Sequence, residues 1–542
     1  MNKKILIFGI ILSALMISSC VKDLDVIPQD PTKILAGNLG DDPAYMNQAL
    51  GKIYASFIIS GQGANGGDDI AASDGNFFTT MRALWNLQEI TTDEAICAWG
   101  DVGIADLNTQ TWSPSNPFLT ALYQRLALSI TYANDFINNA QLYGTENVDR
   151  YVAEARFLRA LAYYWAIDLF GQFPFTTEED GVGKFFPEIG TRQEIFNYIE
   201  SELLAIENSL GAPRFSYPQA DQAAAWMLLS RLYLNAEVYT GTPRWSDVVT
   251  YTGRVIGAGY SLAPDYRQNF SADNDGRSNP EMIFAWEQDG MNVQGYVGTT
   301  FIIESSSDAQ YIRAEDFHGL TSNTNWNGNR ARIQFLDVMV DTIATYGNVP
   351  IPASDPTFSE CPDQRVFLKM KKDRNIPSPS ASGDYGIGVY KFTARNANGT
   401  LPANYNTAYA CTDFPVFRLA DAYMMRAEAL FRLGGAENIQ AAVNDINLIR
   451  QRAYGDDSGN IEVADLTLDF IIDERAREFY YEAQRRTDLV RFGKFTGGDY
   501  LWQWKGGAYA GTSTSEHLNL FPIPGDELSS NPNYNDQNNP GY

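Results

Sequence analysis

Histidine and cysteine are scarce in this chain of 542 residues, which contains 2 His and 4 Cys. So few imidazoles argue against His-rich metal sites and most His-based catalysis. His318 and His517 stand alone in the sequence, which predicts structural or surface roles for both. Cys97, Cys361 and Cys411 lie far apart with no Cys-x-x-Cys spacing, so neither a zinc site nor a disulfide framework is predicted. Since these three are an odd number, at least one is predicted to be a free thiol.

Basic residues are also few, with 40 Lys plus Arg against 66 Asp plus Glu and a net charge of −26. Nucleic-acid binding needs a basic surface over the phosphates, so this charge argues against nucleic acid as a partner. The sequence contains no Gly-x-Ser-x-Gly, His-Glu-x-x-His, P-loop or dinucleotide-binding fingerprint. With 44% hydrophobic residues the chain is predicted to be globular, and its 30 Tyr, 30 Phe and 10 Trp suit a surface protein that binds neutral polar ligands.

Long apolar runs are absent except at the N-terminus, where residues 5–17 follow two lysines. As a helix this run would span only ~20 Å, too short for a hydrocarbon core of ~30 Å, so residues 1–19 are predicted to be a secretory signal. The signal ends in Ile-Ser-Ser-Cys, which resembles a bacterial lipobox and predicts lipidation of Cys20. Acyl chains there would attach the protein to a membrane through its N-terminal lipid alone, with residues 20–42 as a tether.

Three segments share one helical texture, in which small Ala alternates with bulky aromatic residues. They are ARFLRALAYYWAIDLFG (155–171), AAAWMLLSRLYLNAEVYT (223–240) and AYMMRAEALFRLG (422–434). In the first segment four-residue steps place one set of apolar side chains on one helix face, namely Phe157, Leu161, Trp165 and Leu169. Trp165 and Trp226 are accordingly predicted to be core residues. Partner helices are predicted at 123–142, 194–210, 245–256, 441–453 and 466–491.

The spacing of these segments indicates a repeat, because Phe157 and Trp226 are separated by roughly two periods of the ~34-residue tetratricopeptide hairpin. The predicted fold class is mostly α, a tetratricopeptide-like helical-repeat superhelix that occupies mainly residues 123–256 and 417–495. Residues 60–120 and 260–415 are instead rich in Gly, Asn, Ser, Asp and aromatics. Loops this long in a compact protein are usually functional. We therefore expect one body, 43–542, whose scaffold displays a large irregular ligand-binding subdomain.

Several blocks, in matching order, resemble the RagB/SusD family. They are AEARFLRALAYYWAIDLFGQFPF (153–175), DQAAAWMLLSRLYLNAEVY (221–239), FRLADAYMMRAEALFRLGG (417–435), INLIRQRAY (446–454), DERAREFYYEAQRRTDLVRFGKF (473–495), FPIP (521–524) and QNNPGY (537–542). The resemblance implies a mostly helical, tetratricopeptide-containing lipoprotein on the outer membrane of Bacteroidetes, exposed to the cell exterior. Such proteins are not enzymes: they bind glycans and cap a TonB-dependent, SusC-like transporter that imports them.

Stretches outside the scaffold are most similar to the starch-binding protein of that family. They are TTDEAICAWGD (91–101), TWSPSNPF (111–118), YLNAEVYTG (233–241), NFSADND (269–275) and YLWQWKGGAYAGTS (500–513). By this match Trp99, Tyr296 and Trp326 fall where that protein presents an arc of aromatic rings. Arg82 falls where it has a donor to sugar hydroxyls. A glucose ring has an apolar C–H face and a rim of hydroxyls, so aromatic platforms with a few donors and acceptors suit it. The match thus implies that the arc binds an α-glucan or malto-oligosaccharide, with Arg82 and Asp101 bonding to hydroxyls.

Two positions depart from that match. Cys97 stands where the starch-binding protein has a further Trp, and Val102 stands where it has a hydrogen-bonding Asn. The loss of one ring and one polar contact leaves another α-glucan, a fructan or a different glycan open as the ligand. A secreted glycoside hydrolase, which needs two carboxylates ~5–10 Å apart across a sugar cleft, is the alternative from another functional class. A non-glycan nutrient such as a peptide is a third.

The segment Asp273-Asn274-Asp275-Gly276 is a fragment of a calcium-loop pattern, with two carboxylates ahead of a turn-forming Gly. The rest of the EF-hand sequence is missing, so an Asp/Asn turn is the alternative interpretation. The similar stretch in the starch-binding protein favours a structural Ca²⁺ ion held by Asp273 and Asp275. No organic cofactor is predicted.

The Arg/Glu-rich segment 473–491 carries Glu474, Glu478 and Glu482 at four-residue intervals, with several arginines between them. Carboxylates spaced in this way and alternating with Arg are far more often structural ion pairs than acid/base pairs. We therefore predict a scaffold role for this segment and no catalytic residue in the chain.

Overall fold

The computed structural model describes residues 43–61, 69–70, 79–140, 147–180, 186–276, 278–340, 358 and 361–542. The predicted signal, the predicted lipidation site Cys20 and the predicted tether of residues 20–42 lie outside these residues. None of the described helices combines the length and the hydrophobicity that crossing a bilayer requires.

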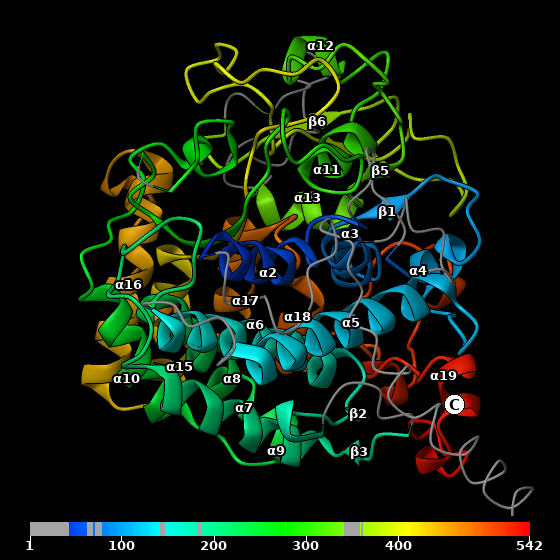
Figure 1. Cartoon of the computed structure of the whole chain (residues 1–542). Coiled ribbons are helices and arrows are strands. Elements are labelled where there is room, and N and C mark those ends of the chain that lie inside the picture. The colour runs from blue at the N-terminus through cyan, green and yellow to red at the C-terminus, as the bar shows by residue number, and fades with distance from the viewer. Residues whose placement is uncertain are drawn as a thin grey trace, which may run out of the picture.

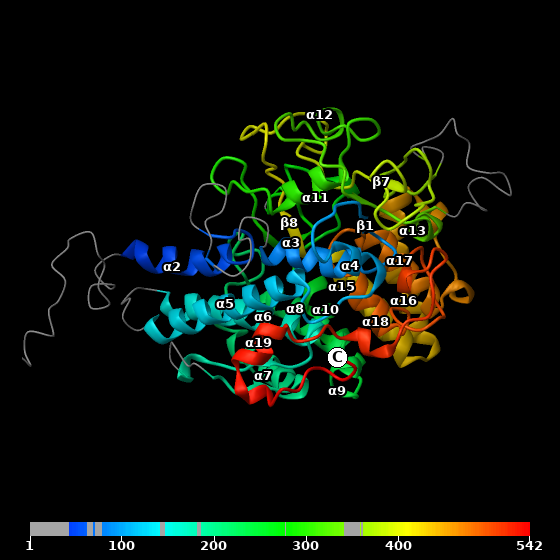
Figure 2. The same cartoon turned by 90° about the vertical axis from the view of Figure 1, so that its right-hand side faces the viewer.

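Long helices form one side of the molecule, the lower half of Figures 1 and 2. They are α5 (Pro117–Asn139), α6 (Val148–Leu169), α7 (Arg192–Ile206), α8 (Gln222–Leu234), α10 (Trp245–Ile256), α15 (Leu419–Leu433) and α16 (Ala436–Tyr454). Successive helices contact one another from α5 through α8 to α10, and then from α10 through α15 to α16. The chain is mostly helical, as predicted, and the long predicted helices are present.

Two of the predicted helices are broken. Residues 466–491 form α17 (Leu468–Phe479) and α18 (Arg485–Arg491), because Tyr481 and Ala483 adopt left-handed φ angles of 64° and 57°. The turn between them brings the Tyr481 ring to 5.1 Å from the Trp85 ring, so packing overrides the helical pattern. Residues 223–240 likewise divide at Asn235 into α8 and the short α9 (Ala236–Thr240).

The predicted apolar face of α6 is confirmed, because its side chains at four-residue steps are all buried, namely Phe157, Leu161, Trp165 and Leu169. Alanines between them are buried as well, which lets neighbouring helices approach closely. Trp226 on α8 is different, since it is only half-buried and its Nε1 donates to Glu207 Oε1 at 3.1 Å. Its prediction as a core residue was therefore only partly right.

The loop-rich part lies on the other side of the long helices, the upper half of Figures 1 and 2. Its described helices are short, and its strands form antiparallel pairs. The helices are α11 (Thr299–Ser306), α12 (Ala314–Phe317) and α13 (Ile333–Met339). Of the strands, β5 (Asn329–Arg330) pairs with β1 (Ile96–Cys97), β6 (Leu368–Met370) pairs with β7 (Ile387–Val389), and the buried β4 (Met282–Trp286) pairs with β8 (Phe414–Arg418).

The N-terminal segment and the chain end complete the body. α2 (Pro43–Ala55) packs across α5 and α6, and α3 (Thr80–Trp85) continues into a π-helical turn, Asn86–Ile90, before α4 (Ile104–Thr109). A further small ladder joins β2 (Phe173–Pro174) to β3 (Ile189–Gly190), and α19 (Gly525–Ser530) lies near the C-terminus. The Tyr542 hydroxyl accepts a hydrogen bond from Trp112 Nε1 at 2.8 Å, so the last residue packs against the start of the scaffold.

The carboxylates of α17 form buried ion pairs, as predicted. Glu478 lies within 3.1 Å of Arg365, within 2.6 Å of Arg418 and within 2.5 Å of Arg452. These arginines hold the pKa of Glu478 well below its usual range, although burial alone would raise it. Glu474 is held in the same way, with a pKa lowered to about 2 against the opposing effect of burial, by its own arginine neighbours. The network joins α17 to β8 and α16, which makes it a structural feature of the scaffold.

The three described cysteines are all free thiols, so the absence of a disulfide framework predicted for them holds among these residues. His318 is buried, as expected of a structural residue, and desolvation lowers its pKa to about 3, which keeps the ring neutral. His517 packs edge-on against the Tyr542 ring with a centroid distance of 4.8 Å.

Candidate functional site

Three aromatic rings predicted to form a site do lie together. The Trp326 ring is central, with its centroid 6.2 Å from that of Trp99 and 5.8 Å from that of Tyr296. Neighbouring ring planes are inclined by 52° and 62°, so the row turns along its length. All three side chains are half-buried, and those of Trp99 and Trp326 pack against the hydrophobic core. We call Trp99, Tyr296 and Trp326 the aromatic arc.

Trp99 is positioned by the short β1–β5 ladder. Ala98 N–H donates to the Gly328 carbonyl at 2.9 Å, and Trp99 Nε1 donates to the Trp326 carbonyl at 3.0 Å. A Cβ atom at Gly328 would lie only 2.4 Å from Trp99 Cε2, so the indole can approach this backbone only because residue 328 has no side chain. The ladder and this glycine bring together two tryptophans that are far apart in the sequence.

The Trp326 loop owes its shape to alternating asparagines. Asn323, Asn325 and Asn327 have φ angles of 55°, 64° and 51°, in the left-handed region that Asn tolerates better than most residues. Trp326 Nε1 donates to the Asn323 carbonyl at 2.6 Å, and Asn325 Oδ1 accepts from the Ala314 N–H at 2.9 Å. The loop is therefore a built structure that orients the central ring.

Glu304 on α11 holds the Trp326 loop through two hydrogen bonds. Its Oε2 accepts a hydrogen bond from the Asn325 N–H at 2.7 Å, and its backbone carbonyl accepts from the Trp326 N–H at 3.0 Å. Burial raises the pKa of the Glu304 carboxyl to about 8, although the bond from Asn325 opposes the shift. The carboxyl is therefore mainly protonated at neutral pH. The sequence context, Phe-Ile-Ile-Glu-Ser, did not single this residue out.

Arg82 is buried beside Trp99, whereas Asp101 is exposed two residues after it. Arg82 on α3 is only 6% exposed, and its guanidinium lies 4.5 Å from the Phe301 ring centroid and 5.8 Å from that of Trp99. It thus sits behind the Trp99 ring, where a cation is attracted to aromatic faces. Asp101 is exposed in the turn after Trp99. The hydroxyl contacts of both residues stay predictions.

The two departures from the starch-binding pattern have different surroundings. Cys97 is buried in β1, and desolvation raises the pKa of its thiol to about 11, so it is a packing residue here. Val102 is 81% exposed beside Asp101. Position 102 therefore presents an apolar side chain to the open surface, where the starch-binding pattern has a hydrogen-bonding Asn.

Tyr409 extends the arc and was not predicted. Its ring centroid lies 4.9 Å from that of Tyr296, with the planes inclined by 43°. The residue is half-buried in the loop before β8, and burial, with Tyr296 beside it, raises its pKa to about 12. Its setting in Asn-Tyr-Asn-Thr-Ala-Tyr, a polar loop with two tyrosines, was the available signal.

The segment predicted to bind calcium forms a turn whose carboxylates are used locally. Asp273 Oδ1 accepts from the Ala397 N–H at 2.8 Å, and Asp275 Oδ1 accepts from the Ser278 hydroxyl at 2.7 Å. Glu281 further on is paired with Arg418 at 2.8 Å. Over the described part of the chain no three Asp, Glu, His or Cys side chains are grouped as metal ligands would be. The residues do not form a ready calcium cage, and calcium stays a prediction.

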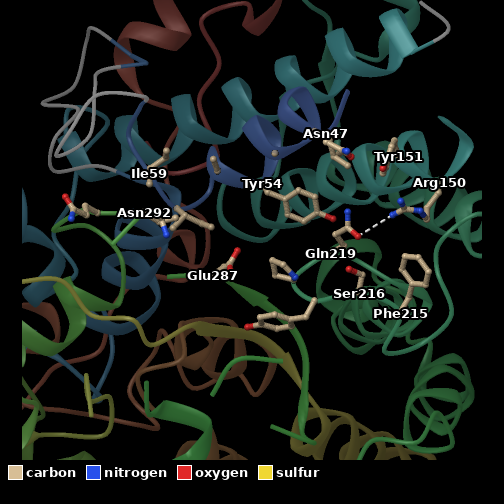
Figure 3. A pocket seen from close by; sticks show the side chains of 18 of the residues that line it. Asn47, Tyr54, Ile59, Arg150, Tyr151, Phe215, Ser216, Gln219, Glu287 and Asn292 are labelled. Atoms are coloured by element: carbon tan, nitrogen blue, oxygen red, sulfur yellow. Dashed lines mark hydrogen bonds between the residues drawn. The ribbon is translucent and has the colours of Figure 1, made fainter. Parts of the chain in front are cut away.

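A large cavity lies elsewhere in the described part of the chain, next to α2. It has a volume of about 880 Å³ and lies between α2, the first turn of α6, the loop 215–219 and residues 287–294 (Figure 3). None of the residues of the aromatic arc lines it. An open row of rings can bind a polysaccharide along its length, so the arc is the stronger candidate for the main site.

Comparison with protein families and known proteins gives consistent matches. The model described as the SusD family matches residues 252–542, and that described as starch-binding associating with outer membrane matches residues 76–234. The chain is 34% identical to the starch-binding protein SusD of Bacteroides thetaiotaomicron, over 97% of this chain and 96% of that protein.

Solved structures share the fold at lower identity. A SusD-like protein from Bacteroides fragilis superposes with a TM-score of 0.68 at 18% identity, covering 93% of this chain and 98% of its own. Surface glycan-binding protein A from Bacteroides thetaiotaomicron, in complex with laminarihexaose, superposes with a TM-score of 0.64 at 19% identity, covering 90% and 97%. At these identities the likeness concerns the fold alone.

Proposed function

Since the chain belongs to the SusD family, we propose that it is a cell-surface lipoprotein that binds starch or malto-oligosaccharide and delivers it to a TonB-dependent outer-membrane transporter. The family consists of binding proteins, and the chain is not an enzyme. The observation that carries the proposal is the convergence of Trp99, Tyr296 and Trp326 into one half-exposed row of rings. Identity of 34% to a starch-binding protein over nearly the whole chain supports the ligand class.

The shape of the aromatic arc supports an α-glucan as the ligand. Successive ring planes turn by 52° and 62°, so platforms laid against consecutive sugar faces would follow a curved chain. An α-1,4-glucan is helical, whereas a β-1,4-glucan is straight and would meet such tilted rings poorly. Rigid aromatic side chains lose little conformational entropy on binding, which suits capture by surface contact. Asp101 at the rim would accept hydrogen bonds from hydroxyls, and Arg82 would hold the Trp99 ring.

The scaffold is inferred to be a tetratricopeptide superhelix. The helices from α5 to α16 pack in succession, α5 with α6, α6 with α7, α8 with α10 and α15 with α16. Stacked helical hairpins in which each unit contacts its neighbours are the arrangement of such repeats. In this proposal the stack serves as a rigid base that holds the two loop-rich segments of the site.

Membrane attachment is proposed to depend on Cys20. Two or three acyl chains on that residue would anchor the protein firmly on the outer membrane, facing the exterior, since a single chain gives only marginal binding. A SusC-like transporter is the proposed partner. Cys20→Ser is expected to move the protein from the membrane fraction to the soluble fraction, and the lipidated parent is expected to co-purify with a TonB-dependent transporter.

Affinity electrophoresis tests the ligand. The purified protein is run through gels that contain starch, pullulan, dextran, levan or a β-glucan, with a non-binding protein as the mobility reference. Retardation by starch and pullulan is expected. Because Cys97 and Val102 depart from the starch-binding pattern, levan tests a fructan and dextran another α-glucan in the same role. If no α-glucan slows the protein, the starch proposal is refuted.

A further inference from the structure

The cavity beside α2 combines aromatic, apolar and polar groups around a space of ligand size. Its volume of about 880 Å³ falls within the ~300–1,000 Å³ of small-molecule sites. Figure 3 shows Tyr54 and Gln219 near its middle, with Arg150 and Phe215 towards one end and Glu287 and Asn292 towards the other. The cavity thus has two chemically different ends joined by a tyrosine.

One end presents an open aromatic surface. The Phe215 side chain is 50% exposed although it is wholly apolar. The Arg150 guanidinium lies 5.1 Å from the Phe215 ring centroid and 4.4 Å from that of Tyr151, which holds the two rings about one cation. An exposed ring kept in place in this way is a platform for an apolar face of a ligand.

The positive charge of Arg150, at the Phe215 end of the cavity, is neutralised by an ion pair. Arg150 Nη1 lies 2.5 Å from Glu154 Oε1, and the other carboxylate oxygen of Glu154 accepts from the Tyr54 hydroxyl at 2.8 Å. An anionic ligand would therefore meet no unpaired cation here. At the opposite end the exposed Glu287 carboxylate adds negative charge, so phosphate and carboxylate ligands are disfavoured throughout.

The polar groups suit a ligand with many hydroxyls. Gln219 accepts from Arg150 Nη1 through its oxygen at 3.4 Å, which leaves its amide nitrogen as a donor to a ligand. Asn292 donates through Nδ2 to Asp289, which leaves its oxygen as an acceptor. Glu287 is a second acceptor in the same cavity. Donors and acceptors around apolar surfaces match a neutral sugar, whose hydroxyls both donate and accept.

We propose that this cavity is a second carbohydrate-binding cleft, in which Phe215 receives a sugar face and Gln219, Asn292 and Glu287 bind hydroxyls. The cleft is close to the aromatic arc, because Gln294 lines it and two residues of chain, at most ~7 Å, separate Gln294 from Tyr296. A glucan long enough to leave the arc would therefore reach the cleft, and the two sites would act together on polymers. This inference rests on the proposed glycan-binding function.

The test compares variants of the cleft with ligands of different length. Phe215→Ala and Gln219→Ala change residues that are at least partly exposed, so both variants are expected to fold. Phe186→Ala is the matched control, since Phe186 is 54% exposed and lies outside both sites. Affinity for amylopectin is measured by affinity electrophoresis, and affinity for maltotriose by isothermal titration calorimetry.

Loss of an aromatic contact of this kind is expected to weaken amylopectin binding by about five-fold or more, with maltotriose binding at the arc unchanged. Trp326→Ala should retain weak retardation by amylopectin, and adding Phe215→Ala should remove it. Amylopectin binding equal to that of the parent in both cleft variants would overturn the second cleft alone. A parent protein that binds no glycan would instead overturn the proposed function, and the cleft with it.

Discussion

Replacing Trp326 with alanine should damage glycan binding more than any other single change in the arc. Trp326 is the central ring, in contact with Trp99 on one side and Tyr296 on the other. Truncation of a central aromatic anchor typically costs about 2 kcal/mol or more, and 1.4 kcal/mol is tenfold in Kd, so a loss of ~30-fold or more is expected. Tyr409 stands at the end of the row beside Tyr296. A single aromatic contact is worth ~0.5–1.5 kcal/mol, which predicts a loss of only ~2- to 12-fold for Tyr409→Ala.

Calorimetric titration with maltoheptaose measures both losses. Trp226→Ala serves as the control, because Trp226 is also a half-buried tryptophan but lies on the scaffold helix α8. Its binding should equal that of the parent. Thermal unfolding of each variant shows whether the fold is intact before affinities are compared.

The relative size of the two affinity losses tests whether Trp326 is the central binding residue of the arc. If Tyr409→Ala lost more affinity than Trp326→Ala, the central position of Trp326 would have no energetic meaning. If neither change altered binding while the parent bound maltoheptaose, the glycan would bind elsewhere and the arc would not be the site.

Three further predictions concern stability and metal binding. Glu478→Ala leaves Arg365, Arg418 and Arg452 buried without a shared carboxylate, so denaturant unfolding should show a loss of about 3–5 kcal/mol that the exposed Glu437→Ala does not. The pKa of Glu304 is raised to about 8 in the folded protein, above the unfolded value of ~4.3. The stability contributed by the protonated carboxyl is therefore complete below pH ~4.3 and is lost as the pH rises towards 8. Glu304→Gln should flatten this decline in the free energy of unfolding, and a decline equal to that of the parent would contradict the prediction. Calcium binding at Asp273 and Asp275 predicts that CaCl2 raises the Tm and that Asp273→Asn abolishes this rise. An unchanged Tm would support the alternative interpretation, an Asp/Asn turn that binds no calcium.

The scaffold was predictable because its signals are local. The four-residue spacing from Phe157 to Leu169 identifies a buried helix face whatever surrounds it, and the interleaved charges of 473–491 indicate ion pairs. The break at Tyr481 was not predictable in this way. It depends on the contact with Trp85 and on the hydrogen bond from the Tyr481 N–H to Glu94, and both partners are far away in the sequence.

The site was only partly predictable for the same reason. Resemblance placed Trp99, Tyr296 and Trp326 in an arc, and the structure brings these rings together. Tyr409 joins them through packing, and its polar loop with two tyrosines does not by itself specify that contact. Arg82 was assigned by resemblance as a donor to sugar hydroxyls, and its position against the Trp99 and Phe301 rings follows only from the fold.

The buried ion pairs have a consequence for behaviour in salt. The chain carries a net charge of −26, so its surface carboxylates repel one another, and salt screens such exposed charges beyond ~8 Å at physiological ionic strength. Glu478 and Arg418 are 0% and 2% exposed, and mobile ions cannot come between them. Raising the ionic strength should therefore increase resistance to unfolding, because it weakens surface repulsion and leaves the attraction inside the scaffold intact.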